Sequence, residues 1–208
     1  MANVHVSQHP LVKHKVTQLR DRATGSKQFR ELVDEITTLL LYEATQDLPV
    51  CETEVETPLT RTVGARLEYN LGFVPILRAG LGMVPAALGL LPLAQVWHLG
   101  LYREHDTRMP VEYYNKLPRD LDIDVALVLD PMLATGGSAV AAVDVLKLRQ
   151  LKAVKFVGLI AAPEGVEALS SAHPDVSIHV AAVDSHLNDQ AYIVPGLGDA
   201  GDRLFGTS

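Results

Sequence analysis

The stretch Val125-Ala-Leu-Val-Leu-Asp-Pro-Met-Leu-Ala-Thr-Gly-Gly-Ser138 decides the fold of this chain. It opens with five apolar residues, a run that predicts a strand buried on both faces. Asp130 stands where that strand would end. The pair Gly136-Gly137 then leads into the apolar-periodic segment 139–148. We therefore expect a tight turn followed by a helix, with Ser138 near the helix N-cap.

This strand, turn and helix together suit a phosphate group. Glycine lets the backbone approach a ligand closely, and the free N–H groups at a helix start can donate to phosphate oxygens. The hydroxyls of Thr135 and Ser138 can add to them, and Asp130 can bind sugar hydroxyls or a metal carried by the phosphate. Because no Gly-Lys-Ser/Thr follows, the stretch is not a Walker loop. The alternative is an ordinary glycine-rich connection between a strand and a helix.

Two further segments bear on the choice. Phe73-Val-Pro-Ile-Leu-Arg-Ala-Gly-Leu-Gly82 is a second apolar strand that ends in a tight Arg-Ala-Gly turn, and Tyr192-Ile-Val-Pro-Gly-Leu-Gly-Asp-Ala-Gly-Asp-Arg-Leu-Phe-Gly206 is rich in glycine. In this order along the chain, the three segments resemble those of the uracil phosphoribosyltransferase family, a branch of the type I phosphoribosyltransferases. The resemblance covers essentially the whole chain. Its specific part is the terminal segment, since the first stretch is shared across the superfamily.

The resemblance implies a reaction. Members of the family transfer the 5-phosphoribosyl group of 5-phosphoribosyl 1-diphosphate (PRPP) to uracil, giving UMP and diphosphate, with Mg²⁺ held mainly by PRPP and possible help from Asp130 or Asp199. Catalytic roles would fall to Asp130, Asp199 and Arg103. The PRPP-binding residues implied are Arg78, Ala79, Gly80, Arg103, Asp130, Pro131, Met132, Leu133, Ala134, Thr135, Gly136, Gly137, Ser138 and Asp199. Those implied for uracil are Ile193, Gly198, Asp199 and Ala200.

Two features of these segments qualify the resemblance. Many type I relatives carry two adjacent acids where this chain has Asp130-Pro131, a departure typical of the uracil branch, so a mechanism that needs both acids is in doubt. The terminal segment also satisfies G-x-G-x-x-G. It is not a dinucleotide fingerprint, because seven residues after Gly201 leave no room for the helix, second strand and ribose-binding acid of that motif.

Two other functions remain open. One is a PRPP-sensing regulator of the same fold that binds RNA, and the formal charge of −7 argues against a broad nucleic-acid surface. The other is a phosphoribosyltransferase for another nucleobase, such as a purine, against which the terminal segment argues.

Composition predicts a single globular domain over residues 1–208, with 48% hydrophobic and 21% charged residues. The lone Cys51, the lack of a signal peptide and the lack of a membrane-spanning run favour a cytoplasmic protein without a membrane partner. The eight histidines show no metal-binding spacing. The family resemblance further implies a homo-oligomer and a possible GTP effector.

Alternating strands and helices predict an α/β fold, a mostly parallel sheet flanked by helices, as in type I phosphoribosyltransferases. Strands are expected at 72–77, 95–101, 124–129, 153–160 and 176–183, and helices at 13–20, 27–45 with Ser26 as N-cap, 81–90, 138–149 and 163–171. Residues 50–62 and 184–208 would form a small hood over the site. The polar segment 103–121 is predicted to be a lid loop, with a disordered surface excursion as the alternative.

Overall fold

The computed structural model describes residues 3–103, 110–118 and 120–207. Its helices are α1 (Pro10–Arg20), α2 (Ser26–Ala44), α3 (Val84–Leu90), α4 (Gly137–Lys147), α5 (Pro163–Ala172) and α6 (Ala200–Phe205), with the 3₁₀ helix η1 (Ala79–Met83). Its strands are β1 (Val4–Val6), β2 (Val50–Glu56), β3 (Arg61–Leu67), β4 (Leu71–Leu77), β5 (Gln95–Val96), β6 (Leu99–Arg103), β7 (Pro110–Asn115), β8 (Val125–Leu129), β9 (Met132–Leu133), β10 (Ala153–Ala161), β11 (Ser177–Val183), β12 (His186–Leu187) and β13 (Ile193–Val194).

A mostly parallel sheet forms the centre of the molecule, which confirms the predicted fold class. Its strands follow the order β1-β11-β10-β8-β4-β6-β7, and β7 runs antiparallel to β6 at one edge. The β4–β8 pair at the middle is in register from Leu71 opposite Val125 to Pro75 opposite Leu129. Because parallel strands end at the same edge, the residues that follow β4 and β8 meet there.

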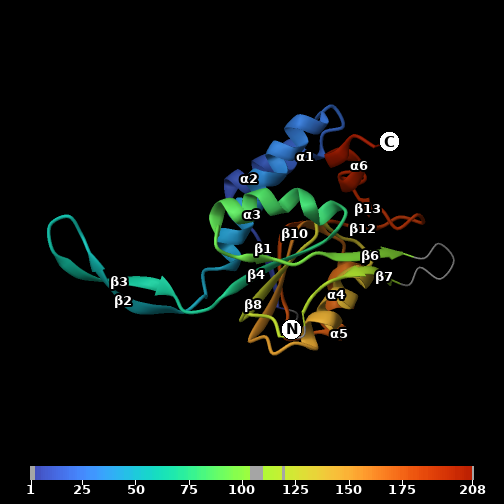
Figure 1. Ribbon diagram of the computed structural model, residues 1–208. Coiled ribbons are helices and arrows are strands. Elements are labelled where there is room, and N and C mark those ends of the chain that lie inside the picture. Colours follow the sequence, from blue (N-terminus) through green and yellow to red (C-terminus); the bar gives the residue numbers. More distant parts are fainter. Residues whose placement is uncertain (1–2, 104–109, 119, 208) are drawn as a thin grey trace.

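Helices cover both faces of this sheet (Figure 1). Helices α1, α2 and α3 lie on one face, and α4 and α5 on the other. The alternation along β8 follows from the two-residue period of a strand. Val125, Leu127 and Leu129 pack in the cluster with α1 and α2, whereas Ala126 and Val128 pack in the cluster with α4 and α5.

Part of the segment predicted to be a lid loop is strand. Residues 110–115 form β7, which pairs with β6 from Leu99 opposite Asn115 to Arg103 opposite Pro110. The run Val111-Glu-Tyr-Tyr114 is rich in the β-branched and aromatic residues that favour strands, and this signal outweighs the flanking prolines. Residues 104–109, Arg108 among them, lie outside the described residues.

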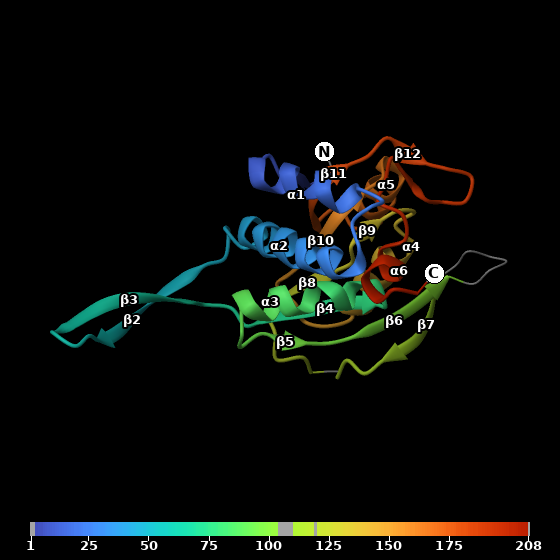
Figure 2. The same cartoon turned by 90° about the horizontal axis from the view of Figure 1, so that it is seen from above.

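The hairpin of β2 and β3 contains the residues 50–62 that were expected to form part of a hood. It enters the sheet through β4 at Leu71, so it projects from the end of β4 opposite Arg78 (Figure 2). Within one chain it therefore does not cover the carboxyl ends of the strands. The C-terminal residues 184–207 do lie at that edge, as the next section describes.

The N-caps of two helices differ from the prediction by one or two residues. Gly25 is the N-cap of α2, and Ser26 is the first helical residue. Gly136, in the left-handed conformation, is the N-cap of α4, so Ser138 lies inside the helix. Within the described ranges, the longest and most apolar helices still fall short of what a membrane crossing requires.

A partly buried polar cluster joins the edge strand β1 to the sheet. The rings of His5 and His179 stack with centroids 4.6 Å apart. His179 also lies within hydrogen-bond distance of Ser177, and the buried Lys155 donates to the Ala44 carbonyl and to Asp47. Burial lowers the pKa of His179 to about 4, and the charges of His5 and Lys155 act in the same direction.

This cluster predicts a loss of stability in mild acid. His179 titrates near pH 6.5 in an unfolded chain and near pH 4 in the folded protein, so the unfolded state binds the extra proton between these values. We expect the free energy of unfolding to fall by about 1 to 2 kcal/mol from pH 6.5 to pH 4 through this group. Urea unfolding at several pH values should show a flatter profile for His179→Gln. An identical profile for the variant would assign the acid sensitivity to other groups.

Candidate active site

The stretch predicted to bind phosphate, residues 125–138, forms the expected strand, turn and helix at the carboxyl edge of the sheet; it is called the phosphate-binding stretch below. β8 ends at Leu129, and Asp130 follows it directly. The short strand β9 then lies beside β10, with Met132 opposite Ile160. Gly136 has a φ of 81°, and α4 begins at Gly137. The first amides of α4 therefore face the turn, where an anion can accept from them.

Helix α5 supports this turn from behind. A Cβ on Gly136 would lie 2.8 Å from the Cβ of Ala168 and 2.9 Å from the carbonyl oxygen of Gly165. Gly165 in turn sits so close to the backbone of residues 133 and 134 that its own Cβ would lie 2.4 Å from the Ala134 carbonyl oxygen. The turn is thus packed tightly between α4, which follows it, and α5. Sequence inspection missed Gly165, because no local pattern reveals a packing partner so distant along the chain.

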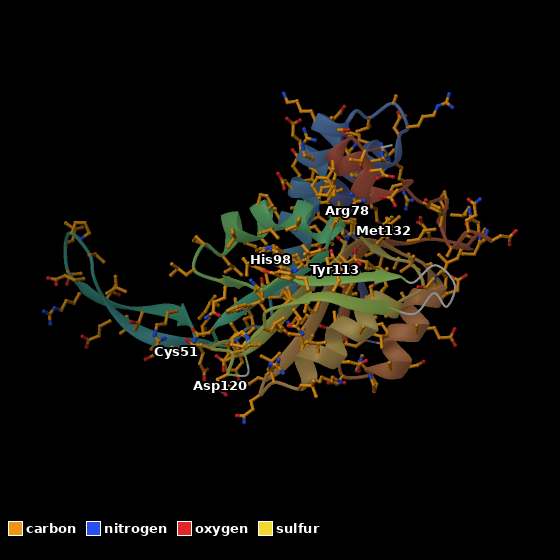
Figure 3. The ribbon with its side chains drawn as sticks, turned by 45° about the vertical axis from the view of Figure 1, so that its right-hand side comes forward. Cys51, Arg78, His98, Tyr113, Asp120 and Met132 are labelled. Carbon is orange, nitrogen blue, oxygen red and sulfur yellow. The ribbon has the colours of Figure 1, made fainter. Side chains whose placement is uncertain are left out.

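The Arg78 turn lies directly beside Asp130. Arg78 follows β4 and precedes η1, and the Leu77–Arg78 peptide bond is cis. A Cβ on Gly80 would lie 2.3 Å from the Leu129 carbonyl oxygen, so the bare backbone of η1 rests on the end of β8. In the view of Figure 3, Arg78 and Met132 are labelled next to each other, below the red C-terminal helix α6.

Arg78 also faces the C-terminal helix. Its Nη2 lies 3.9 Å from Oδ1 of Asp202 in the first turn of α6, and both side chains are exposed. Asp202 was not among the predicted residues. Its proximity places the Arg78 guanidinium beside the C-terminal segment, where Nη2 would also lie 3.9 Å from a Cβ on Gly201. Arg103 ends β6, next to β4 in the sheet, and the structure describes its backbone only.

The C-terminal segment folds over this edge as a small hairpin, a turn and a helix. β12 and β13 pair antiparallel, and the Leu187 amide donates to Glu164 at the start of α5. This backbone hydrogen bond lowers the pKa of Glu164. Asp199 then caps α6, since its Oδ1 accepts from the Asp202 amide at 2.9 Å. Asp199 therefore has a structural role, although capping uses only one of its two carboxylate oxygens.

One cavity joins predicted residues from two of the three segments singled out in the sequence. It measures about 310 Å³ and opens at the carboxyl edge of the sheet. Its lining residues are Asp130, Met132, Ala134, Gln190, Ala191, Tyr192, Ile193 and Asp199. Asp130, Met132 and Ala134 come from the phosphate-binding stretch, whereas Ile193 and Asp199 come from the terminal one. The predicted neighbours Thr135, Gly137 and Ser138 adjoin it through the α4 turn.

Three of the lining residues, Gln190, Ala191 and Tyr192, were not predicted. They belong to the bend between β12 and β13, and Ala191 has a φ of 64°, a value rare outside glycine. The sequence Asn188-Asp-Gln-Ala191 contains turn-forming residues and could have predicted a turn there. It could not have predicted that this turn lies at the same cavity as Asp130. A larger cavity of about 540 Å³ lies at the other end of β4, and none of its lining residues belongs to the three segments.

Comparison with known proteins assigns the family. The sequence model described as uracil phosphoribosyltransferase matches residues 6–207. The chain belongs to the uracil phosphoribosyltransferase family. A relative of that name from Roseiflexus castenholzii is 64% identical over 207 residues, and one from Geobacillus kaustophilus is 58% identical over 208 residues, each covering both chains completely.

Solved structures support the same fold. The AQ2163 protein from Aquifex aeolicus is 41% identical, with a TM-score of 0.91 over 99% of each chain. An adenine phosphoribosyl transferase from Trypanosoma brucei is only 10% identical, with a TM-score of 0.57 over 96% of this chain and 89% of its own. The second likeness bears on the fold alone. It shows that this chain shares its fold with that phosphoribosyl transferase.

The packing of Gly136 gives a prediction about stability. Gly136→Ala would force a side chain into a left-handed residue and against Ala168, so we expect the free energy of unfolding to drop by about 1 to 3 kcal/mol. Gly89→Ala is the matched control, because a Cβ there meets nothing within 4 Å and the residue lies in α3. Denaturant unfolding of both variants measures the difference. Equal stabilities would contradict the tight packing of this turn.

Proposed function

We propose that this protein transfers the 5-phosphoribosyl group from PRPP to uracil and releases UMP and diphosphate. The observation that carries the proposal is the shared cavity, in which Asp130 of the phosphate-binding stretch faces Ile193 and Asp199 of the terminal segment. A donor held by the first stretch and a base held by the second would thus meet inside one site. Full-length similarity to curated uracil phosphoribosyltransferases supports the choice of base.

The phosphate groups of PRPP would be held at two places. The amides at the start of α4 and the hydroxyls of Thr135 and Ser138 would bind the 5′-phosphate. Arg78, the Ala79-Gly80 backbone and Arg103 would bind the diphosphate through charge-assisted hydrogen bonds. Asp130, between these places, would bind the ribose hydroxyls. This arrangement holds the anomeric carbon still while positive charge develops on the sugar as diphosphate leaves.

The backbone of the terminal segment would recognise the base. Amide N–H and carbonyl groups have fixed polarity, so the backbone of Ile193 and of Gly198–Ala200 can match O2, N3–H and O4 of uracil. Cytosine presents the opposite polarity at N3 and C4, and the unpaired groups would disfavour it. Asp199 lines the same cavity and would approach the base N1, which must lose its proton as the new bond forms.

The cavity also fits a Mg²⁺ ion carried by PRPP. Asp130 and Asp199 both line it, and Mg²⁺ commonly binds through one or two carboxylates together with substrate phosphates. When bound, the ion would neutralise charge on the diphosphate. Within the described residues, no group of three or more potential metal ligands occurs. Homo-oligomer formation, a GTP effector and a cytoplasmic location stay predictions from the sequence.

A product assay tests the proposed function. The protein is incubated with PRPP, Mg²⁺ and, separately, uracil, cytosine, hypoxanthine or adenine, and nucleotides are separated by chromatography. We expect UMP to form with uracil, and the other bases to react at least about 100-fold more slowly, since they leave polar groups of the site unpaired. Preferred conversion of a purine would overturn the proposal. PRPP binding without any product, together with tight RNA binding, would favour the regulatory alternative.

Asp199→Asn separates catalysis from capping. Asparagine caps helices about as well as aspartate, so the midpoint of thermal unfolding should hardly change. If the charge of Asp199 acts on the base or on the ion, kcat should fall by about 100-fold or more. Steady-state kinetics with uracil and calorimetric unfolding provide the two readouts. Near-normal turnover would show that Asp199 serves only to cap α6.

A further inference from the structure

A partly buried ion pair holds Gly196, which lies between the proposed base-binding residues Ile193 and Gly198. Arg20, the last residue of α1, donates from Nη1 and Nη2 to the two carboxylate oxygens of Asp184, at 2.7 and 2.5 Å. The same Nη1 donates to the Gly196 carbonyl at 2.7 Å, and Oδ2 of Asp184 accepts from the Gly196 amide at 2.9 Å. Both polar groups of Gly196 are therefore fixed by one pair of side chains.

A second arginine holds the next residue. Arg203 of α6 donates from Nη1 to the carbonyls of Leu197 and Leu19, at 2.8 and 2.7 Å. Its guanidinium lies over the ring of Phe29, 4.4 Å from the centroid. The end of α1 is thus joined to the turn in two ways. Arg20 of α1 donates to Gly196 directly, and Arg203 of α6 bridges the carbonyls of Leu19 and Leu197. Figure 2 shows α6 beside the ends of α1 and α2.

The turn has little freedom left. Gly196 has a φ of 64°, and a Cβ there would lie 2.0 Å from the Ile193 carbonyl oxygen. Leu197 is buried, as are Ile193 and Ala200 on either side. The Asp184 side chain is only 4% exposed, so its charge is compensated by Arg20 rather than by water. Residues 193–200 are therefore fixed on one side by the hydrophobic core and on the other by the end of α1.

We propose that Arg20 and Asp184 are positioning residues for base recognition. They do not touch the 310 Å³ cavity, whose lining includes neither residue. They fix the Gly196 peptide, and through it the direction in which the backbone of Gly198–Ala200 meets the base. Backbone groups that bind a base cannot adjust by changing a side-chain rotamer. Their position therefore depends on the residues that hold the backbone in place. This inference rests on the proposed function, since it assumes that residues 193 and 198–200 read uracil.

Asp184→Asn and Arg20→Lys test this role with small changes of shape. If the introduced asparagine keeps its amide oxygen on the Gly196 amide, its NH₂ group faces Nη2 of Arg20, so donor meets donor. A lysine at position 20 cannot reach both carboxylate oxygens and the Gly196 carbonyl in the fork geometry of arginine. Val12→Ala is the control, because it opens a cavity under the same helix, where Val12 is fully buried, without touching the turn.

We expect KM for uracil to rise about tenfold in Asp184→Asn and Arg20→Lys, the size of one lost charge-assisted hydrogen bond. KM for PRPP should stay within about twofold, because the phosphate-binding turn and Arg78 are unchanged. The double variant should show no larger effect than either single one, since both remove the same restraint. Val12→Ala should lower the thermal midpoint but leave KM for uracil unchanged.

Two results would overturn the role. One is an unchanged KM for uracil in Asp184→Asn and Arg20→Lys. The other is an equal rise of KM for uracil in Val12→Ala, which would show that Arg20 and Asp184 only stabilise α1. A wild-type protein that does not convert uracil at all would instead overturn the proposed function, and the inference with it. The wild-type assay therefore separates the two failures.

Discussion

The parallel pairing of β4 with β8 is the constraint on which the site depends. Its register brings Pro75 opposite Leu129, two residues before β4 ends, so Arg78 and Asp130 both emerge at the same edge of the sheet. The contact of Gly80 with the Leu129 carbonyl then leaves no room between the two loops. A slip of one residue in this pair would turn every side chain of β4 to the other face and separate the arginine from the carboxylate.

The second half of the site is added by the end of the chain. Residues 184–207 reach the carboxyl edge because buried groups anchor them, Ile193 and Leu197 in the core and Asp184 on Arg20. The proposed donor site and the proposed base site thus rest on separate helices: α5 packs against the turn at residues 134–138, and α1 contacts the terminal turn. This division is consistent with a reaction in which two substrates must be held independently and then brought into line.

Much of this could be predicted from local sequence, and the misses have physical causes. The strand 125–129, Asp130 at its end and the helix after Gly137 follow from apolar periodicity and glycine placement. Capping was less predictable, because Gly25 and Gly136 fill positions that Ser26 and Ser138 suggested. The direction of the 50–67 hairpin depends on which end of β4 it joins, and Arg20, Asp184 and Gly165 act through contacts distant in sequence, which single-chain patterns do not report.

Binding of UMP and uridine tests the central claim most directly, that the turn at residues 134–138 holds the 5′-phosphate. Calorimetry on the wild-type protein should show UMP bound at least about 100-fold more tightly than uridine, since the phosphate supplies several charge-assisted hydrogen bonds. Gly137→Val, which places a branched side chain at the start of α4, should bring the UMP affinity down to that of uridine while the protein stays folded. UMP affinity unchanged by this substitution would contradict the account.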